Sequence, residues 1–418
     1  RYLIPVTSEE AIDTIIRNTG MITDEELLPA HECRDRITAR AVRAVFSNPP
    51  FLCAAMDGYA VAFKNTLGAD LANPVKLSRV RDTQAIPVNT GDLLPKGMDA
   101  VIMIEDVEED ASSICIRKPV YLWQNVRMIG EDLIEGDMLL PANYRIGVFD
   151  IGMIISAGVT HVPVRRRPVF TVIPTGKELV NIFKETFAVH GDPRLIDFNS
   201  YTLKNMGEET GYQVKMADIA RDKNELRESL RHALEKSDVV LINAGTSAGR
   251  EDYTEGIIKE QGQVLFHGVS MMPGKPTLFG IIEGKPVFGI PGYPVSAAIT
   301  FKTFLVPLYE KLTNSRKYAN SVSCKMAYKT PSRIGIEEII RVNLLSNNHS
   351  YSAVPLGRGA SIFSSMAKAD GIVRIPENVE GLDEDETTTC ELLRDEQEIV
   401  SRIHVIGSHD LSLDILRN

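Results

Sequence analysis

The sequence predicts a multidomain protein that combines an α/β domain with β-rich parts, and three observations lead to this fold class. The chain has 418 residues, which at typical domain sizes corresponds to about two to four domains with cores of their own. Strand-like and helix-like segments alternate from Arg167 to about Asn314. Short β-type runs broken by Gly, Pro and Asp occupy residues 48–143 and return after Ser315.

The segment from Thr7 to Gly20 is predicted to be a helix with both ends marked. Thr7 and Glu10 have the spacing of a capping box, in which each side chain accepts a hydrogen bond from the other residue's backbone. Four apolar residues recur on one face, namely Ala11, Ile12, Ile15 and Ile16. Gly20 is expected to end the helix in the left-handed conformation.

The segment from Arg167 to about Asn314 is predicted to form a largely parallel sheet with helices on both faces. Three strand candidates have the sequences PVFTVIPT, DVVLINA and KPVFGIPG. The helix candidates are NSYTLKNMGEETG, NELRESLRHALEKS and PVSAAITFKTFL. Repeated strand–loop–helix order is typical of a parallel sheet between helices, and ligands bind such sheets at the carboxyl ends of the strands.

Charge and hydropathy argue against two classes of partner. The chain has 46 Lys and Arg against 56 Asp and Glu, a formal net charge of −10. This acidic balance argues against nucleic acid, because phosphate backbones attract basic surfaces. The longest apolar stretch, from Ile146 to Val159, contains Asp150 and three glycines and is too short to span a membrane. We therefore expect neither nucleic acid nor a membrane as a partner.

The cysteines and the first residues indicate a cytoplasmic protein. Five cysteines are scattered without a CxxC pair, which is typical of a reduced compartment and argues against a disulfide frame or a zinc cluster. The first residues, RYLIPVTSEEA, lack the apolar core of a signal peptide. The last residues, from Ile403 on, are expected to form a strand, a turn and the start of a helix. They either pack as an appendage or open a further domain, and the second interpretation is favoured.

A glycine-rich loop after the second strand candidate allows two interpretations. Gly245-Thr246-Ser247-Ala248-Gly249 has the G-x-S-x-G pattern of the nucleophile elbow in α/β-hydrolases, with Asp252 and His267 as candidate partners. His267 follows Ser247 by only 20 residues, however, which is too close for the usual order of elements. A phosphate-cradling loop or a tight turn is therefore the favoured interpretation.

A second motif, Gly274-Lys275-Pro276-Thr277, resembles the end of a P-loop but fails as one. The preceding glycine, Gly268, stands one residue too far away, and Pro276 occupies the place of the hydroxyl residue that binds Mg²⁺. A Gly-Lys pair between prolines is still a rigid turn that presents an ammonium group. Such a turn suits an anionic ligand, and a solvated lysine is the equally weighted alternative.

Carboxylates beside glycines or in turns form the third signal. They are Asp57, Asp132, Glu178, Asp222 and Asp252. A single acid of this kind is usually a turn former. Several acids together with Thr90, Lys275 and backbone amides would suit a Mg²⁺–phosphate site, because hard cations need oxygen ligands.

Seven motifs, which carry all of these residues except Asp222, occur in the order of a known family. They are PPFLCAAMDGYAV, VNTGDLLPKGMDAVIMIEDV, VRMIGEDLIEGD, VIPTGKELV, NAGTSAGREDY, HGVSMMPGKPTLFG and GKPVFGIPGYPVSAAITF. Together they resemble the molybdopterin molybdenumtransferase family, which includes bacterial MoeA and the C-terminal domain of gephyrin. The resemblance runs from about Tyr2 to Leu393 and includes IEEIIRV and GRGASIFSSMAKADGIVRIP.

The resemblance implies an elongated protomer of four parts and a short final segment. These are a discontinuous N-terminal domain (1–47 and 144–166), an inserted β-rich module (48–143), a three-layer α/β/α molybdopterin-binding domain (167–315), a C-terminal β-barrel-like domain (316–395) and a linker that opens a further domain (396–418). The final segment resembles the start of a periplasmic-binding-like domain, which some members carry. Members form homodimers, and the cleft lies between the α/β domain of one chain and the β module of the other.

The reaction of the family implies the substrates and the cofactor. Adenylylated molybdopterin, made by an upstream molybdopterin adenylyltransferase, reacts with molybdate in the presence of Mg²⁺. The phosphoanhydride is cleaved, molybdenum is placed on the dithiolene, and AMP and the molybdenum cofactor are released. The resemblance thus implies a cytoplasmic transferase of molybdenum cofactor biosynthesis.

Carried over residue by residue, the resemblance also implies the roles of single side chains. The catalytic residues are Asp57, Asp132, Glu178 and Asp252, and the metal ligands among them are Asp57, Asp132 and Asp252. The binding residues for the pterin and molybdate are Thr90, Asp222, Gly245, Ser247, Lys275, Pro291, Pro294, Arg341 and Ser364, with Arg341 and Ser364 assigned to molybdate.

Two residues depart from the motifs of the family. The first lysine of its K-P-G-K turn is Met272 here, and the asparagine of its G-N-P-V-S motif is Tyr293. The loss of one cation and one amide implies weaker phosphate binding, a different metal such as tungstate, or a non-catalytic molybdopterin-binding sensor or scaffold of the same fold. The acids are all retained, which favours the enzyme.

Overall fold

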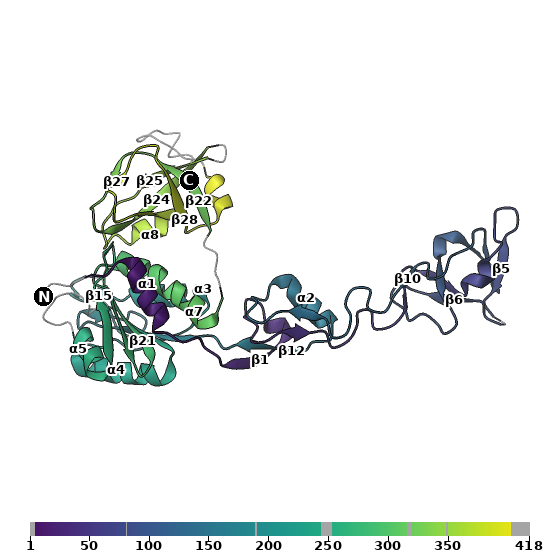
Figure 1. Ribbon diagram of the computed structural model, residues 1–418, viewed down its shortest axis with the longest axis horizontal. Coiled ribbons are helices and arrows are strands. Elements are labelled where there is room, and N and C mark those ends of the chain that lie inside the picture. Colours follow the sequence, from purple (N-terminus) through teal and green to yellow (C-terminus); the bar gives the residue numbers. More distant parts are fainter. Residues whose placement is uncertain are drawn as a thin grey trace. The chain divides into compact units, whose positions relative to one another are not determined.

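The structure, a computed structural model, describes residues 5–80, 82–188, 190–243, 253–315, 320–347 and 350–402. The described residues form two compact units (Figure 1). The smaller unit is Thr23–Arg166. The larger unit combines the residues up to Ile22 with those from Arg167 on.

In the described part of the larger unit, six strands form one sheet in the order β16-β13-β17-β21-β20-β18. The strands are β13 (Val169–Pro174), β16 (Gln213–Met216), β17 (Val239–Asn243), β18 (Gln263–His267), β20 (Leu278–Ile282) and β21 (Lys285–Ile290). The first four in this order are parallel, as predicted, whereas β20 is antiparallel to both of its neighbours. Glu283 and Gly284, with φ of 51° and 75°, make the tight turn that reverses the chain between β20 and β21.

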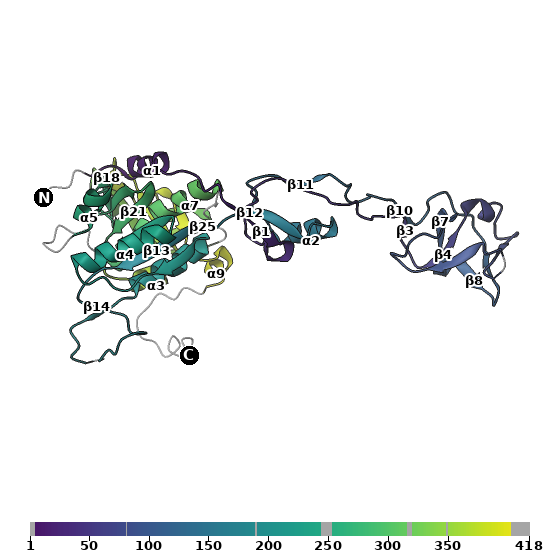
Figure 2. The ribbon, with the colours of Figure 1, turned by 90° about the horizontal axis from the view of Figure 1, so that it is seen from below.

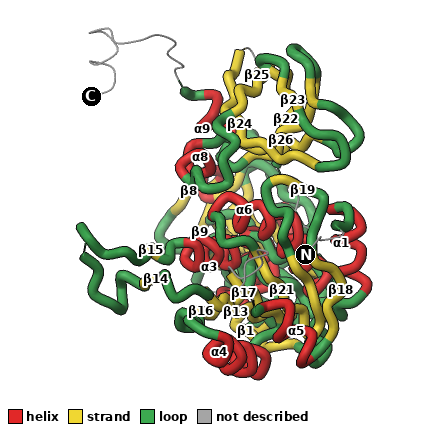
Figure 3. Tube along the Cα trace, turned by 90° about the vertical axis from the view of Figure 1, so that its left-hand side faces the viewer, coloured by secondary structure: helices red, strands yellow, loops and turns green. Residues whose placement is uncertain are grey.

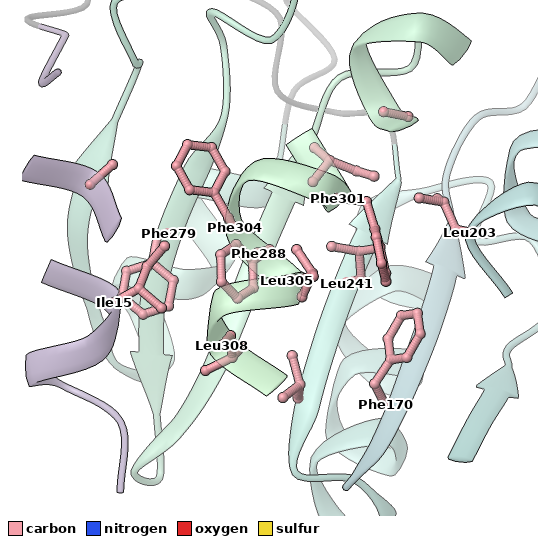
Figure 4. Close-up of a cluster of buried hydrophobic side chains, with 14 of the residues drawn as sticks. Ile15, Phe170, Leu203, Leu241, Phe279, Phe288, Phe301, Phe304, Leu305 and Leu308 are labelled. Atoms are coloured by element: carbon pink, nitrogen blue, oxygen red, sulfur yellow. The ribbon is translucent and has the colours of Figure 1, made fainter. Parts of the chain in front are cut away.

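Helices cover both faces of this sheet. Val239 and Leu241 of β17 belong to the hydrophobic cluster on one face, and Val240 and Ile242 to the cluster on the other, which explains the continuous apolar run in this strand. The helices of the first face are α1 (Ser8–Arg17), α3 (Asn199–Thr210), α6 (Pro294–Thr300) and α7 (Val306–Thr313), with a π-helix, Phe301–Leu305, between the last two. Those of the second face are α4 (Lys223–Lys236) and α5 (Thr254–Gln261). Figure 4 shows the first cluster.

Helix α1 begins as predicted but ends differently. Thr7 Oγ1 accepts a hydrogen bond from the Glu10 amide, and a Glu10 carboxylate oxygen accepts one from the Thr7 amide, so the capping box is confirmed. The prediction that Gly20 ends the helix is wrong, because the helix ends at Arg17. Asn18 Nδ2 donates to the Thr14 carbonyl at 2.8 Å. This bond satisfies a carbonyl of the last turn, so no left-handed residue is needed.

Helix α1 packs in the larger unit, although a domain shared with residues 144–166 is predicted for residues 1–47. Its buried Ala11 and Ile15 belong to the same hydrophobic cluster as Leu312 of α7. The Ile22 amide also donates to the Leu312 carbonyl at 2.8 Å. An amphipathic helix needs an apolar surface for its stripe, and the first face of the sheet supplies one. The other predicted domain boundaries stay predictions.

The C-terminal part of the larger unit contains a closed barrel, as predicted. Within the described residues, each of five strands pairs with two others in the circular order β24-β25-β22-β28-β26. They are β22 (Ser321–Met326), β24 (Glu337–Asn347), β25 (Ser350–Pro355), β26 (Gly371–Ile375) and β28 (Thr387–Leu392). The short strand β19 (Met271–Met272) extends from the α/β part and pairs with the start of β24. This pairing brings the turn after β19 next to the barrel.

The smaller unit is rich in short strands, as predicted for residues 48–143. Two three-stranded sheets are described there, β6-β4-β7 and β5-β9-β8. Their strands are β4 (Gly58–Val61), β5 (Val75–Ser78), β6 (Ala85–Val88), β7 (Ala100–Met103), β8 (Val107–Glu109) and β9 (Ser113–Ile116). Elsewhere in this unit, β1 (Glu25–Pro29) pairs with β12 (His161–Arg165) near helix α2 (Val148–Ser156), as Figure 2 shows. No helix in the described residues is long and apolar enough to cross a membrane.

Gly58 begins β4 where the backbones of two strands approach closely. A Cβ atom at this position would lie 1.9 Å from the carbonyl oxygen of Ile102 in β7. We expect Gly58→Ala to lower the free energy of unfolding of the smaller unit by more than about 3 kcal/mol, because backbone must move. Urea unfolding followed by the fluorescence of Trp123, the single tryptophan of the chain, reports on this unit.

Gly152→Ala is the matched control for this prediction. Gly152 lies inside α2, and a Cβ atom there would meet nothing within 4 Å. Alanine in a helix is favoured over glycine by up to about 1 kcal/mol, so this variant should be as stable as the wild type or more stable. Equal urea midpoints for Gly58→Ala and the wild type would contradict the close approach of β4 and β7.

Candidate active site

A cavity of about 1120 Å³ lies at the carboxyl ends of the parallel strands. Its wall includes Thr175 and Gly176 after β13, Asn243 at the end of β17, and Pro291 and Gly292 after β21. This is the edge of the sheet at which the sequence predicts ligand binding. The volume is sufficient for a ligand of nucleotide size or larger.

Several of the predicted site residues line this cavity, and others do not. Glu178, Asp222, Pro291 and Pro294 lie in its wall, together with Tyr293, the residue that departs from the family motif. Lys275 is exposed and lines neither this cavity nor the smaller one described below, although its neighbour Pro276 does line the large cavity. Gly245, Ser247 and Asp252, with the loop of the hydrolase interpretation, lie outside the described residues.

Two of the acids in the wall have neighbours that fix their position: Asp222 caps a helix, and Glu178 lies against a glycine. Asp222 is the N-cap of α4, where its Oδ1 accepts hydrogen bonds from the amides of Asn224 at 2.7 Å and Glu225 at 3.0 Å. Glu178 folds back over Gly176, where a Cβ atom would lie 2.6 Å from a Glu178 carboxylate oxygen. Gly176 therefore leaves room for this carboxylate at the cavity wall.

Arginines that were not predicted from the sequence also lie in the cavity wall. Arg194 and Arg221 both pair with Glu185, at 3.2 Å and 2.8 Å. Hydrogen bonds from the Arg194 side chain hold the pKa of Asp192 well below its usual range. These residues lie on or beside the segment that begins at β14 (Leu179–Val180) and returns at β15 (Leu195–Ile196), which Figure 3 shows next to the sheet. In the sequence, the alternating charges of this loop do not indicate a binding site.

A second cavity, of about 370 Å³, lies between the turn after β19 and the barrel. Its wall includes Met272 and Pro273 from the turn, and Arg333, Arg341 and Arg358 from the barrel part. The large cavity is lined by Pro276, three residues further along the same turn. The turn that carries the motif Met-Pro-Gly-Lys-Pro thus contributes to both cavities.

Arg341 is buried without a carboxylate partner among the described residues. It is 1% exposed. Its Nε donates to Ser365 Oγ at 3.1 Å, and its Nη2 donates to the carbonyls of Gly357 and Gly359. Burial lowers the pKa of Arg341, but a guanidinium remains charged near neutral pH. A buried cation held only by neutral groups retains a strong attraction for an anion.

The other charged residues of the small cavity leave it positive. Arg358 pairs with Glu338 at 3.0 Å, whereas Arg333 makes no ion pair within the described residues. Ser332 also lies in the wall, and its Oγ is buried with no hydrogen-bond partner in the part of the chain that the structure describes. Three guanidinium groups and one carboxylate therefore surround a space with an uncommitted hydroxyl.

The serine assigned to molybdate by the resemblance is not the one that contacts Arg341. Ser364 is exposed and begins helix α8 (Ser364–Lys368), and the hydrogen bond from Arg341 goes to the next residue, Ser365. Ser365 is buried, and its hydroxyl also donates to the Ile362 carbonyl at 2.6 Å. A sequence motif with two adjacent serines could not distinguish them.

The remaining predicted residues lie in the smaller unit. Asp57, in the turn before β4, accepts hydrogen bonds at its Oδ1 from the Thr90 amide at 2.6 Å and the Thr90 hydroxyl at 2.9 Å. These two donors, the amide first, lower the pKa of Asp57. Asp132 Oδ2 accepts a bond from Asn48 Nδ2 at 3.1 Å. The structure thus joins Asp57 to Thr90 by two hydrogen bonds. The described residues contain no group of three or more acids, histidines or cysteines that could hold a metal.

Comparison with protein families covers nearly the whole chain. The MoeA N-terminal region (domains I and II) matches residues 6–158. A molybdopterin binding domain matches residues 171–311. The MoeA C-terminal region (domain IV) matches residues 324–393. Both cavities lie within the larger unit, in which the second and third of these matches fall.

Individual relatives agree with these matches. The chain is 34% identical over 374 residues to a molybdopterin biosynthesis protein of Methanocaldococcus jannaschii, covering 87% of this chain and 91% of the relative. It is 27% identical over 403 residues to the molybdopterin molybdenumtransferase of Haemophilus influenzae, covering 92% and 98%. A crystal structure of a molybdopterin biosynthesis MoeA protein from Pyrococcus horikoshii, 31% identical, superposes with a TM-score of 0.78 over 94% of this chain and 100% of the other. The chain belongs to the MoeA family of molybdopterin molybdenumtransferases, which act in molybdenum cofactor biosynthesis.

Proposed function

We propose that this enzyme inserts molybdate into adenylylated molybdopterin and releases AMP. Water attacks the phosphoanhydride and breaks the bond between the two phosphates, so that AMP leaves with its phosphate and the pterin keeps its own. The two dithiolene sulfurs replace two oxygen atoms of molybdate, which leave as water after protonation, and molybdenum stays in the same oxidation state. An upstream molybdopterin adenylyltransferase supplies the nucleotide substrate. The observation that carries this proposal is the turn after β19, because Met272 and Pro273 line the arginine-rich cavity and Pro276 lines the large cavity.

The large cavity suits the pterin nucleotide. It lies at the carboxyl ends of the parallel strands, where nucleotide-like ligands bind open α/β sheets. Its wall combines aromatic side chains with arginines, and these suit planar rings and phosphates. Glu178, Asp222, Pro291 and Pro294 are the predicted residues that would contact this substrate.

The small cavity suits the oxyanion. Molybdate is a dianion, and Arg333, Arg341 and Arg358 outweigh Glu338 in charge around this space. The hydroxyl of Ser332 adds a donor without a partner. Tungstate has the same charge and shape as molybdate, so the same groups would hold either ion, and the assay below compares the two.

A divalent cation would enter this site with the substrate. Asp57 uses Oδ1 for both of its bonds to Thr90, which leaves Oδ2 for a ligand. Mg²⁺ commonly keeps several waters and binds through one or two carboxylates together with substrate phosphates, so it does not need three acids from one chain. When bound, it would offset the charge that develops on the leaving phosphate oxygen. Asp57 and substrate phosphate oxygens are its proposed ligands, with Asp132 and Asp252 as further candidates.

The proposed cleft is shared between two chains of a homodimer. Asp57, Thr90 and Asp132 lie in the smaller unit, and both cavities lie in the larger unit. In the dimer proposed for this family, the β-rich module of one chain completes the α/β domain of the other. Light scattering should give twice the mass of the chain, and a fully active monomer would contradict the shared cleft.

AMP release with single components omitted tests the proposed reaction. The purified protein is incubated with adenylylated molybdopterin, molybdate and Mg²⁺, and AMP is measured by chromatography. AMP is expected only when Mg²⁺ and molybdate or tungstate are both present. Tight binding of the pterin nucleotide without AMP release under any condition would instead identify a non-catalytic pterin-binding protein.

Thr90→Val should change the pH dependence of this activity. Asp57 acts here as a carboxylate, and the two donors of Thr90 depress its pKa. Activity is therefore retained above the folded-state pKa and is lost as the pH falls through it. Valine removes the hydroxyl donor and keeps the amide, so the pKa of Asp57 should rise toward its ordinary value. The acidic limb of the kcat/KM profile should move to higher pH, and identical profiles would show that Asp57 does not titrate in this limb.

A further inference from the structure

The end of strand β17 carries a buried polar group that the fold does not use. Asn243 is 2% exposed, and the four residues before it in this strand are apolar and fully buried. Its backbone carbonyl accepts hydrogen bonds from the Thr175 amide at 3.0 Å and the Thr175 hydroxyl at 3.2 Å. Its side-chain Oδ1, in contrast, has no hydrogen-bond partner among the described residues. The side chain thus adds nothing to the hydrogen bonding of the sheet.

An amide oxygen that is buried without a hydrogen-bond partner destabilises the folded state, because it has lost its bonds to water. Such groups are rare in folded proteins, and a ligand or an ordered water usually accounts for them. Asn243 lines the large cavity, between Pro174 of β13 and Ile290 of β21, its neighbours across the sheet. Its position therefore places an uncommitted acceptor in the cavity wall at the centre of the sheet.

The surroundings of Asn243 indicate which kind of ligand group would meet it. Aromatic and aliphatic side chains line the same cavity, among them Phe187, Leu195, Phe198, Tyr253 and Tyr293. Tyr293 is 63% exposed and Phe198 42% exposed, so their rings are accessible to a ligand. The acid Asp222 is occupied by capping α4. Flat apolar walls with one free amide suit a planar heterocycle that carries N–H groups on its edge.

We propose that Asn243 recognises the amino-bearing edge of the heterocycle in the large cavity. Its Oδ1 accepts a hydrogen bond from an amino or ring N–H group, and its Nδ2 can donate to a neighbouring ring nitrogen or carbonyl, the two-bond pattern by which asparagine reads adenine. This inference rests on the proposed function, because adenylylated molybdopterin has two such edges, one on the pterin and one on the adenine. Asn243 is thereby a specificity-determining residue for one of the two rings.

Asn243→Leu tests this role, since leucine has a similar volume and no polar atom. The ligand-free variant should melt at the same temperature as the wild type or higher, because the unpartnered amide is gone. The variant should bind the matching heterocycle about tenfold more weakly or worse, since the N–H group of the ligand would then be buried unpaired. A structural role for Asn243 predicts a lower melting temperature instead, and that result would overturn the proposal.

Two probes distinguish the two rings. AMP carries the adenine edge and neopterin monophosphate carries the pterin edge, and binding of each is measured by calorimetry. A loss confined to AMP assigns Asn243 to adenine, and a loss confined to neopterin monophosphate assigns it to the pterin. Unchanged binding of both probes would overturn the inference and leave the proposed function intact. A wild type that binds neither probe would contradict the proposed function and the inference together.

Asn343→Leu is the matched control. Asn343 lies on β24 in the barrel, and its Oδ1 is also buried without a hydrogen-bond partner within the described ranges. It lines neither cavity. The same chemical change there should leave the affinity for both probes unchanged. Equal losses in the two variants would show that the effect on binding does not come from contact with the ligand, which would also overturn the proposal.

Discussion

Replacing Asp57 by asparagine is expected to lower the rate of AMP release about 100-fold or more while the protein stays folded. Asp57 is exposed and lies in a turn, so its substitution leaves no cavity in the core. The amide oxygen of asparagine can still accept the bonds from Thr90, whereas an NH2 group replaces Oδ2, so the negative charge and the proposed ligand oxygen are lost. Steady-state AMP release and thermal unfolding measure the two quantities. Near-normal turnover would show that Asp57 does not bind the metal or the phosphates.

Mixing two impaired variants, assayed at a molybdate concentration well below the KM of the Arg341 variant, tests whether Asp57 acts on the cavities of a second chain. Asp57→Asn is co-expressed with Arg341→Met, which alters the larger unit. In a random population half of the dimers are mixed, and each mixed dimer has one intact cleft, so about one quarter of the wild-type activity should return. No recovery would place Asp57 and Arg341 in the same cleft of one chain.

Replacing Arg341 by methionine is expected to raise the KM for molybdate about 10- to 100-fold, the range for loss of a charge-assisted hydrogen bond. The guanidinium is buried in the small cavity and has no carboxylate partner in the described part of the chain. The affinity for AMP in the large cavity should not change. Because methionine also leaves the carbonyls of Gly357 and Gly359 unpaired, the variant should be less stable than the wild type.

Met272→Lys provides the complementary test, since it adds charge without removing a structural bond. From the sequence we expected position 272 to act on the pterin phosphates, but the structure places Met272 in the wall of the small cavity with Arg341. We therefore expect the variant to bind molybdate about tenfold more tightly and with greater salt sensitivity. Unchanged affinity at two salt concentrations would show that position 272 does not face the oxyanion.

The parts of the fold that could be predicted from the sequence are those with local causes. The capping box of Thr7 and Glu10 and the apolar run of β17 were predicted because neighbouring residues determine them. The reversal at β20 was missed, because it depends on the two positive φ angles of Glu283 and Gly284. The packing of α1 on α7 joins residues about 300 positions apart, which no local pattern reveals.

In the candidate site, too, the residues that a local motif carries were predicted, and those brought together by distant parts of the chain were not. Asp57 and Thr90 were predicted from their motifs, and the structure joins them by two hydrogen bonds. The small cavity was not predicted, because it needs a turn from the α/β part and arginines from the barrel. The unpartnered amide of Asn243 was also invisible in the sequence, where an asparagine after an apolar strand resembles any turn former.

Transfer of the product to a cofactor-free molybdenum enzyme tests the central claim most directly. The protein is incubated with adenylylated molybdopterin, molybdate and Mg²⁺, the AMP and the bound molybdenum are counted, and the mixture is added to the cofactor-free enzyme. We predict one molybdenum inserted for each AMP released, and an activity of the acceptor enzyme that rises with both. AMP release without insertion of molybdenum, or retention of the intact nucleotide with an inactive acceptor, would contradict the account.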